Sequence, residues 1–225
     1  MIATTTALKA LVEQRGHSSL GNSRREEILQ AASKLMVEKG LTAVTIRGVA
    51  RAAGMAPGNL GYYFASHDDL LQALLDWVLE PYLRAFEFLR ANDGNDPIVS
   101  LRAVLDYVLE DLASEETTMF FPELWVLANR DEHNAKRMRD LYNAYMEVLR
   151  ELITAARPDL SRLHIDELAL FICASIEGQT VFIGYKRPYA EHRAALKSIA
   201  LEAMITVVVN HAGDISGTND EEGNS

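Results

Sequence analysis

The sequence predicts an all-α protein with two parts, a small N-terminal head and a larger helical body. Apolar residues recur at intervals of three and four over long stretches, and no segment shows the sustained two-residue alternation of a half-buried strand. Glycines and prolines separate these stretches. With 225 residues, of which 48% are hydrophobic and 24% charged, the chain is long enough to bury a substantial core.

Composition excludes several classes of protein. A single cysteine, Cys173, rules out a disulfide scaffold and a cysteine-rich zinc module. No apolar run approaches the length of a transmembrane helix, so no membrane span is expected. The first residues lack the pattern of a secretory signal, and together with the unpaired thiol this predicts a cytoplasmic protein.

The charge of the chain is unevenly distributed. The net charge of −10 argues at first sight against a nucleic-acid partner. However, residues 1–70 hold eight basic and six acidic residues, whereas residues 71–225 hold 14 basic and 26 acidic ones. This asymmetry predicts two different tasks for the two parts of the chain.

The predicted head, residues 23–70, contains three helices and the start of a fourth. Gly40 ends the first helix, Thr45 starts the second and Gly54 ends it. Pro57 suits the first turn of a short third helix that runs to about residue 64. The fourth starts near Ser66, and Pro81 is expected to kink or break it.

The predicted body, residues 71–212, continues with five further helices. They are expected at about 97–113, 117–129, 132–156, 166–185 and 191–211. Residues 1–22 read as a flexible arm, and the polar, acidic residues 213–225 as a disordered tail.

The second and third helices of the head have the spacing of a helix-turn-helix. A short turn at Gly54 sets two helices at a steep angle, so that the second can present its outer face to a DNA major groove. Two short helices joined at a glycine also occur in helical proteins that bind no DNA. A helical scaffold or a helical enzyme is therefore the alternative.

Residues 25–75 resemble the DNA-binding domain of tetracycline-repressor (TetR) family regulators. The matching residues, with the right gaps throughout, are Ile28…Ala31-Ala32, Gly40…Thr45, Val49-Ala50…Ala53-Gly54, Gly58-Asn59-Leu60…Tyr63-Phe64 and Ser66…Asp68-Asp69-Leu70-Leu71. The resemblance implies a ligand-responsive transcriptional repressor. Such a protein binds a palindromic operator as a homodimer and is released by a small-molecule effector.

The resemblance also implies which residues contact DNA. Arg47 can pair with guanine or phosphate, and Asn59 and Tyr62 can reach a base edge or a phosphate. Gly61 and His67 stand where the family usually has tyrosine and lysine, and Tyr63 is as well suited to packing beneath the helix. The predicted DNA-binding set is Thr45, Arg47, Pro57, Gly58, Asn59, Gly61, Tyr62, Tyr63 and His67.

The last two helices predict a homodimer. Segment 166–185 is apolar nearly all round, so it must be covered on both sides, and the last helix carries one continuous apolar stripe. The resemblance implies a four-helix bundle between two chains; a monomer with one helix at its centre is the alternative. The predicted dimer set is Ile172, Ile176, Gln179, Phe182, Ile183, Leu196, Ile199, Ala200, Ala203, Met204 and Val207.

Aromatic residues between 77 and 145 predict either an effector pocket or ordinary core packing. Glu177 interrupts an apolar helix, where a carboxylate is costly unless paired, so it meets either a cationic ligand or a structural partner. The predicted effector set is Trp77, Tyr107, Phe120, Phe121, Trp125, Asn129, Tyr142, Tyr145, Phe171 and Glu177.

A weaker resemblance concerns the ligand domain of the choline-responsive, betaine-synthesis subgroup of this family. It rests on Glu123-Leu124-Trp125…Asn129, on Tyr142 and Tyr145, and on Ile176-Glu177-Gly178. It does not by itself identify the ligand of this chain.

The sequence contains no motif for catalysis, a cofactor or a metal. It has no His-Glu-x-x-His, no phosphate-binding glycine loop and no nucleophile elbow. Cys173 lies in an apolar helix and is expected to be a small buried hydrophobe. We therefore expect no enzyme activity, no cofactor and no metal site.

Overall fold

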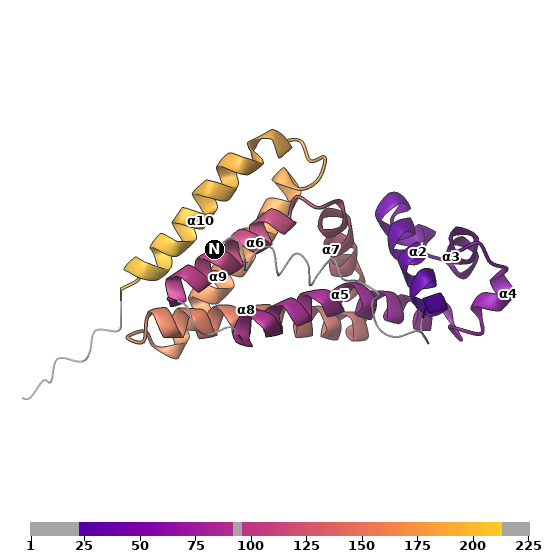
Figure 1. Ribbon diagram of the computed structural model, residues 1–225, viewed down its shortest axis with the longest axis horizontal. Coiled ribbons are helices and arrows are strands. Elements are labelled where there is room, and N and C mark those ends of the chain that lie inside the picture. The colour runs from indigo at the N-terminus through magenta and orange to yellow at the C-terminus, as the bar shows by residue number, and fades with distance from the viewer. Residues whose placement is uncertain (1–22, 92–95, 213–225) are drawn as a thin grey trace, which may run out of the picture.

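The computed structural model describes residues 23–91 and 96–212. Within these residues it is helical and contains no strand, which confirms the predicted all-α fold class (Figure 1). The expected N-terminal arm, residues 1–22, and the expected acidic tail, residues 213–225, lie outside the described residues.

A head of three helices stands at one end of a longer helical body (Figure 1). The head comprises α2 (Ser23–Lys39), the 3-10 turn η1 (Leu41–Ala43), α3 (Ile46–Ala52) and α4 (Pro57–Leu60). The body comprises α5 (His67–Ala91), α6 (Pro97–Asp111), α7 (Glu115–Ala128), α8 (Glu132–Ala156), α9 (Arg162–Ile183), the 3-10 turn η2 (Ala190–His192) and α10 (Arg193–Asn210).

Helix α5 joins the head to the body without interruption. Pro81, where a kink or a break was expected, lies inside it, so the helix is not broken at this proline. A proline in a helix interior removes one backbone hydrogen bond, and packing must offset that loss. Here Val78, Leu79, Tyr82 and Ala85 around Pro81 are all buried, and the packing of these side chains holds the helix together.

Two other helix boundaries also differ from the sequence prediction. Helix α4 ends at Leu60 rather than near residue 64, and Gly61, a weak helix former, follows it in a turn that continues to Tyr63. Helix α9 begins at Arg162 rather than 166, because the Ser161 side chain caps it by accepting a hydrogen bond from the His164 amide.

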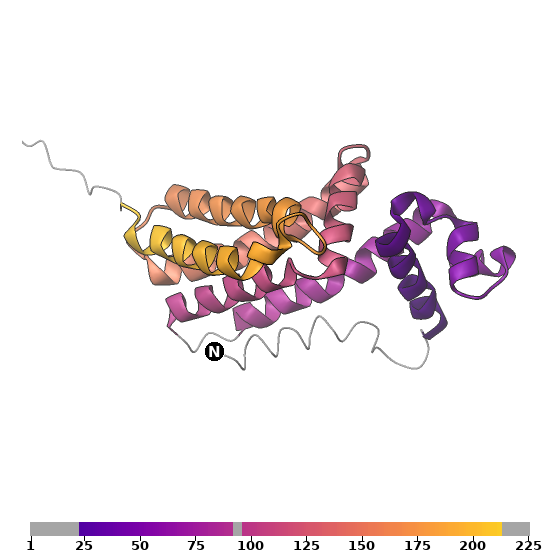
Figure 2. The same ribbon diagram turned by 90° about the horizontal axis from the view of Figure 1, so that it is seen from above.

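Helix α8 contacts most of the other helices of the body. It packs against α5, α6, α7 and α9, while α10 covers α6 and α9 (Figure 2). The Lys197 ammonium on α10 bridges Asp106 and Glu110 on α6 at 2.8 and 2.7 Å. The Arg157 guanidinium, just after α8, donates to the carbonyls of Val208, Val209 and His211. The end of α10 is thereby attached to the end of α8.

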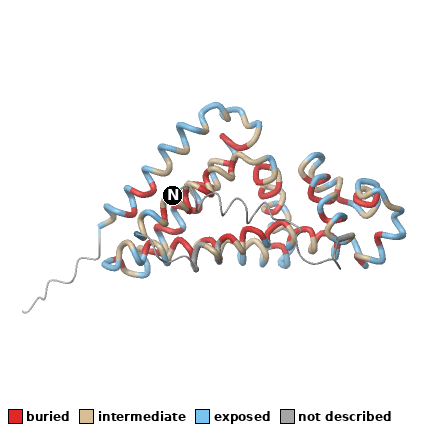
Figure 3. The backbone as a smooth tube through the Cα atoms, viewed as in Figure 1, coloured by how far each residue is buried: buried red, intermediate tan, exposed pale blue. Residues whose placement is uncertain are grey.

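One continuous core runs from the head into the body. It includes Ile28 and Val49 in the head, Leu74 on α5 and Leu149 in the body, all fully buried. The outer sides of α9 and α10 are largely exposed (Figure 3). Among the described helices, none is long and apolar enough to cross a membrane.

Gly48 on α3 generates a prediction about the stability of the head. A Cβ there would lie 2.4 Å from the Ala43 carbonyl oxygen, whereas one at Gly58 would meet no atom within 4 Å. We expect Gly48→Ala to lower the free energy of unfolding by about 1–3 kcal/mol, because the backbone must shift. Gly58→Ala, the matched control, should leave it unchanged or raise it by up to about 1 kcal/mol. Urea denaturation measures both, and equal effects would contradict the close-packing argument.

Candidate functional site

The helix-turn-helix lies at the end of the molecule farthest from α10 (Figure 1). Thr45 caps α3 by accepting a hydrogen bond from the Gly48 amide at 3.0 Å. Gly54 adopts a φ of +63°, which glycine reaches without strain, and the turn closes when the Met55 amide donates to the Ala50 carbonyl at 2.9 Å. Leu60 anchors α4 to the core with its fully buried side chain.

Most of the predicted DNA-binding residues are exposed around this turn. Tyr62 is 88% exposed, and Thr45, Arg47, Pro57, Gly58, Asn59 and Gly61 also belong to the exposed class. Arg51 is exposed as well, one helical turn after Arg47. Arg51 is not in the predicted DNA-binding set, although its spacing from Arg47 places both residues on one side of α3.

Tyr63 and His67 make contacts within the head. Tyr63 is half-buried against the core and supports the exposed Tyr62 ring edge-to-face, with ring centroids 5.3 Å apart. The His67 Nε2 donates to the Val44 carbonyl at 2.6 Å, because a carbonyl oxygen only accepts. His67 therefore links the start of α5 to the loop before α3, a structural role that the sequence did not predict.

A cavity of about 40 Å³ lies inside the body, where five helices meet. It has room for about three water molecules. Its lining residues are Tyr82 on α5, Tyr107, Val108, Asp111 and Leu112 on and after α6, Thr117 and Phe121 on α7, Leu141, Tyr142 and Tyr145 on α8, and Glu177 on α9.

Half of the predicted effector set lines this cavity: Tyr107, Phe121, Tyr142, Tyr145 and Glu177. Trp77 and Phe120 pack elsewhere in the core, and Asn129 is exposed at the end of α7. Phe171 is 49% exposed and is not among the residues that line the cavity, so its assignment to the pocket is corrected. Asp111 and Thr117 were missed, because polar residues at helix ends carry no periodic signal.

Hydrogen bonds fix the polar side chains of the cavity. The Asp111 carboxylate accepts from the Thr117 hydroxyl at 2.6 Å and from the Tyr82 hydroxyl at 3.2 Å. On the opposite wall, the Trp125 indole donates to the Tyr142 hydroxyl at 2.9 Å, and that hydroxyl is bonded in turn to Glu177. Trp125 thus orients Tyr142 instead of lining the cavity itself.

Burial perturbs the ionisation of the groups around Glu177. It raises the pKa of Glu177 to about 7, assisted by the negative charge of Asp111 and opposed by the hydrogen bond from Tyr142. Burial, reinforced by the charge of Glu177, raises the pKa of the Cys173 thiol to about 12, so this thiol is not a reactive nucleophile. The pKa values of Tyr142 and Tyr145 are raised for the same reasons, so both phenols stay neutral.

A second surface lies on α9 and α10, which both expose apolar side chains. On α9 these are Leu163, Leu170, Phe171, Val181 and Phe182, and on α10 they are Leu196, Ile199, Val207 and Val209. The α9 residues recur at helical spacing and leave the small Ala174 and Gly178 exposed between them. We call this surface the α9–α10 face.

The α9–α10 face differs from the predicted dimer set. It contains Phe182, Leu196, Ile199 and Val207, and Ala203 is exposed beside them. The other residues of that set face inward: Ile172, Ile176, Ile183 and Met204 are buried in the core of the same chain, and Gln179 and Ala200 are half-buried. Helix α9 is apolar on two sides, and periodicity alone cannot tell which side meets its own core.

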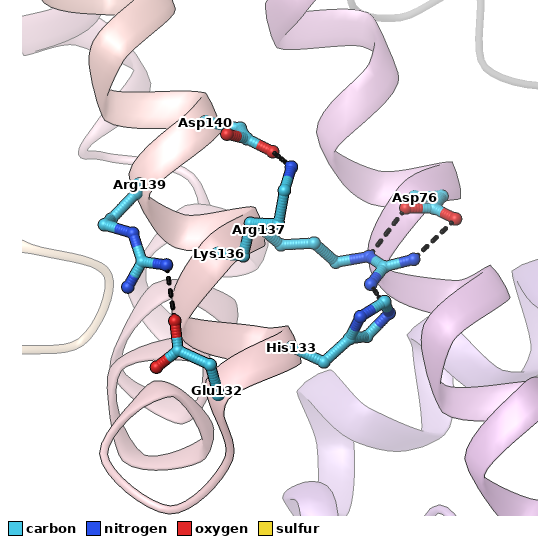
Figure 4. Close-up of polar contacts among 7 residues, drawn as sticks. All are labelled: Asp76, Glu132, His133, Lys136, Arg137, Arg139 and Asp140. Carbon is cyan, nitrogen blue, oxygen red and sulfur yellow. Dashed lines mark hydrogen bonds and ion pairs between the residues drawn. The ribbon is translucent and has the colours of Figure 1, made fainter.

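Helix α5 is fastened to the start of α8 near the head (Figure 4). The Arg137 guanidinium donates from Nε and Nη2 to the Asp76 carboxylate at 2.8 and 3.1 Å, and its Nη1 contacts His133. One turn earlier on α5, Gln72 donates to the buried Asn134 side chain at 3.3 Å. These contacts hold the first third of α5 against the body.

Among the described residues, no group of three or more His, Cys, Asp or Glu side chains is placed to hold a metal ion.

Comparison with known proteins supports the helix-turn-helix assignment. Residues 28–74 match the bacterial regulatory proteins of the tetR family. The chain is 32% identical over 157 residues to an uncharacterized HTH-type transcriptional regulator in the dhlA 5′ region of Xanthobacter autotrophicus, covering 69% of this chain and 74% of that protein. It is also 32% identical over 96 residues to the HTH-type transcriptional regulator BetI of Stenotrophomonas maltophilia, covering 43% and 49%. Both relatives are regulators rather than enzymes.

The fold also resembles solved structures of regulators. One of them is a putative transcriptional regulator from Saccharomonospora viridis in complex with choline. The TM-score is 0.68 at 16% identity, and the superposition covers 84% of this chain and 97% of the other. At this identity the likeness concerns the fold alone.

The raised pKa of Glu177 predicts how stability depends on pH. The unfolded carboxyl ionises near 4.5 and the folded one near 7, so rising pH favours the unfolded state over this interval. The cost reaches about 3 kcal/mol above pH 7. We expect Glu177→Gln to gain stability relative to the natural chain between pH 5 and pH 8, measured by urea denaturation. A pH-independent difference between the two proteins would contradict the raised pKa.

Proposed function

The chain belongs to the TetR family of bacterial regulatory proteins, and from that premise we propose that it is a ligand-responsive repressor. In this proposal a homodimer binds a palindromic DNA operator and leaves it when a small molecule occupies the cavity of the body. Residues 23–70 form the DNA-binding part, and residues 71–212 form the effector-binding and dimerisation part.

The exposed side chains around α3 and α4 support the DNA-binding role. Helix α4 offers Asn59, and Tyr62 follows it with a ring that is 88% exposed. Arg47 and Arg51 on α3 supply positive charge for phosphates. Folding removes little of the Tyr62 ring from water, so the ring adds little to the stability of the fold. The Tyr63 ring holds it in place through an edge-to-face contact. This arrangement is the observation that carries the proposal.

The α9–α10 face supports the dimer. A helix-turn-helix protein reads two half-sites about 34–36 Å apart, and a dimer provides the two heads. A second copy of the same face would cover the exposed side chains of Phe171, Phe182 and Ile199. Small residues at Ala174 and Gly178 would let two α9 helices approach closely.

Two helices connect the cavity to the head. Helix α5 carries Tyr82 in the cavity wall and Leu70 in the core of the head. Helix α7 carries Phe121 in the wall, and nearby its Glu123 carboxylate accepts from the Leu41 amide in the head at 3.5 Å. A ligand that displaces these walls moves the heads and changes their spacing. Thermodynamic linkage makes the two effects equal. The bound ligand weakens operator binding by a certain factor, and the bound operator weakens ligand binding by the same factor.

Arg47→Ala and Tyr62→Ala test the DNA-binding role. We expect each to weaken operator binding by about 1–3 kcal/mol, because each removes a contact to base or phosphate. Arg162→Ala is the matched control, since its side chain is 88% exposed on α9, away from the head. The operator is first recovered by in-vitro selection from random duplexes, and affinity is then measured by fluorescence anisotropy.

The salt dependence of the same binding separates a DNA reader from a helical scaffold or enzyme. Affinity for the selected duplex should fall steeply as salt rises, because phosphate contacts release counterions. The selected sequence should also be a palindrome. Failure to recover any preferred duplex, or equal loss of affinity in all three variants, would refute the proposed role.

Ile199→Glu tests the dimer face. Ile199 is 64% exposed, and a glutamate there places a charge in the proposed interface. We expect the sedimentation coefficient of the variant to shift to that of a monomer at micromolar concentration. Val126→Glu makes a similar change at an exposed apolar position on α7 and should leave the dimer intact. A natural chain that sediments as a monomer would contradict the proposal directly.

A further inference from the structure

The cavity of the body has an unbalanced set of charges. Two carboxylates, Asp111 and Glu177, line it, and none of the lining residues is a lysine, an arginine or a histidine. A buried carboxylate is costly unless a positive charge or several hydrogen bonds compensate it. The two carboxylates differ in how far the protein itself compensates them.

Asp111 is compensated within the protein. It accepts hydrogen bonds from the hydroxyls of Thr117 and Tyr82 at 2.6 and 3.2 Å. Glu177 accepts from the Tyr142 hydroxyl, and no Lys, Arg or His among the described residues forms an ion pair with it. The Trp125 indole donates a hydrogen bond to the Tyr142 hydroxyl oxygen, so the proton of that hydroxyl is directed toward Glu177. The protein therefore orients a carboxylate in the cavity without supplying a cation to it.

The rest of the lining suits a compact cation. Four tyrosine rings and the Phe121 ring surround the carboxylates, and aromatic faces attract positive charge. The volume of about 40 Å³ limits the ligand to a few heavy atoms. Once Glu177 is ionised, an anion would be repelled by the negative charge in the cavity, and a neutral molecule would supply no counter-charge to it.

We propose that the effector of this protein is a compact organic cation, an amine or a methylated ammonium of a few heavy atoms, and that Glu177 is its counter-ion in the cavity. This inference rests on the proposed function, because it takes the cavity to be the effector site. It goes beyond that function by naming the chemical class of the ligand and the residue that selects it.

Binding of a cation is expected to depend on pH. Glu177, with a pKa of about 7, is faced by Asp111 from α6, by Tyr82 from α5, by Tyr142 and Tyr145 from α8 and by Cys173 on its own helix. The phenols of Tyr142 and Tyr145 and the Cys173 thiol have raised pKa values and stay neutral near pH 7. A bound cation favours the ionised carboxylate, so affinity rises with pH as Glu177 loses its proton.

Isothermal titration calorimetry of the full chain with tetramethylammonium chloride tests the inference. The charge of this probe does not titrate, so any pH dependence belongs to the protein. We expect binding that is about tenfold tighter at pH 8 than at pH 6. tert-Butyl alcohol has the same number of heavy atoms and no charge, and it should bind at least tenfold more weakly. Sodium pivalate, an anion with a similar trimethyl head, should not bind.

Two glutamate variants localise the effect. Glu177→Gln should weaken tetramethylammonium binding at least tenfold and abolish its pH dependence, while circular dichroism checks that the variant is folded. Glu147→Gln removes an exposed carboxylate from α8, outside the cavity, and should bind as the natural chain does. No binding of tetramethylammonium, equal binding of tert-butyl alcohol, or undiminished binding by Glu177→Gln would each overturn the inference.

Operator binding, measured with and without tetramethylammonium, separates this inference from the proposed function. Release of the operator supports both. Glu177-dependent binding of the cation without release supports a cation site and refutes the effector role of the cavity. An operator-binding protein that ignores the cation keeps the DNA-binding role and loses the inference.

Discussion

The buried face of α5 is the constraint on which the rest of the structure depends. One helix supplies Leu70 to the core of the head and Leu74, Val78 and Tyr82 to the body, so the two parts share a single core. This packing is strong enough to carry the helix through Pro81, which would end an isolated helix. Because the rigid helix α5 joins the head to the body, a displacement at one end of the helix either moves the other end or breaks contacts along it.

The contacts of α5 with α8 decide where such a displacement could be absorbed. Asp76 is held by Arg137 (Figure 4). Gln72 is held by the buried Asn134, so the first part of the helix is attached to the body. Tyr82, at the cavity, lies beyond this attachment. Helix α7 offers a parallel connection, since Phe121 faces the cavity and the nearby Glu123 approaches the head. Two helices, α5 and α7, therefore connect the cavity to the head.

The head was predictable because its signals are local. The cap at Thr45, the glycine at the turn and the proline that opens α4 each act within a few residues, and the structure has all three. The cavity was predictable only in part. Aromatic residues mark a region of apolar packing, but whether Phe120 or Phe121 lines the cavity is decided by the rotation of α7 against its neighbours. Glu177 was identifiable because a carboxylate inside an apolar helix demands an explanation.

The sequence by itself determined the helices, the helix-turn-helix and the division of charge between an almost neutral head and an acidic body. The net charge of −10 did not indicate whether the protein binds DNA, because most of the negative charge belongs to the body. Only the tertiary structure decided which apolar side of α9 is covered by its own chain, because both sides have helical spacing. Helix α9 packs against α8, and Ile172 and Ile176 are buried. It also decided that His67 bonds to Val44 and that Asp111 faces Glu177, because both pairs join residues far apart in the chain.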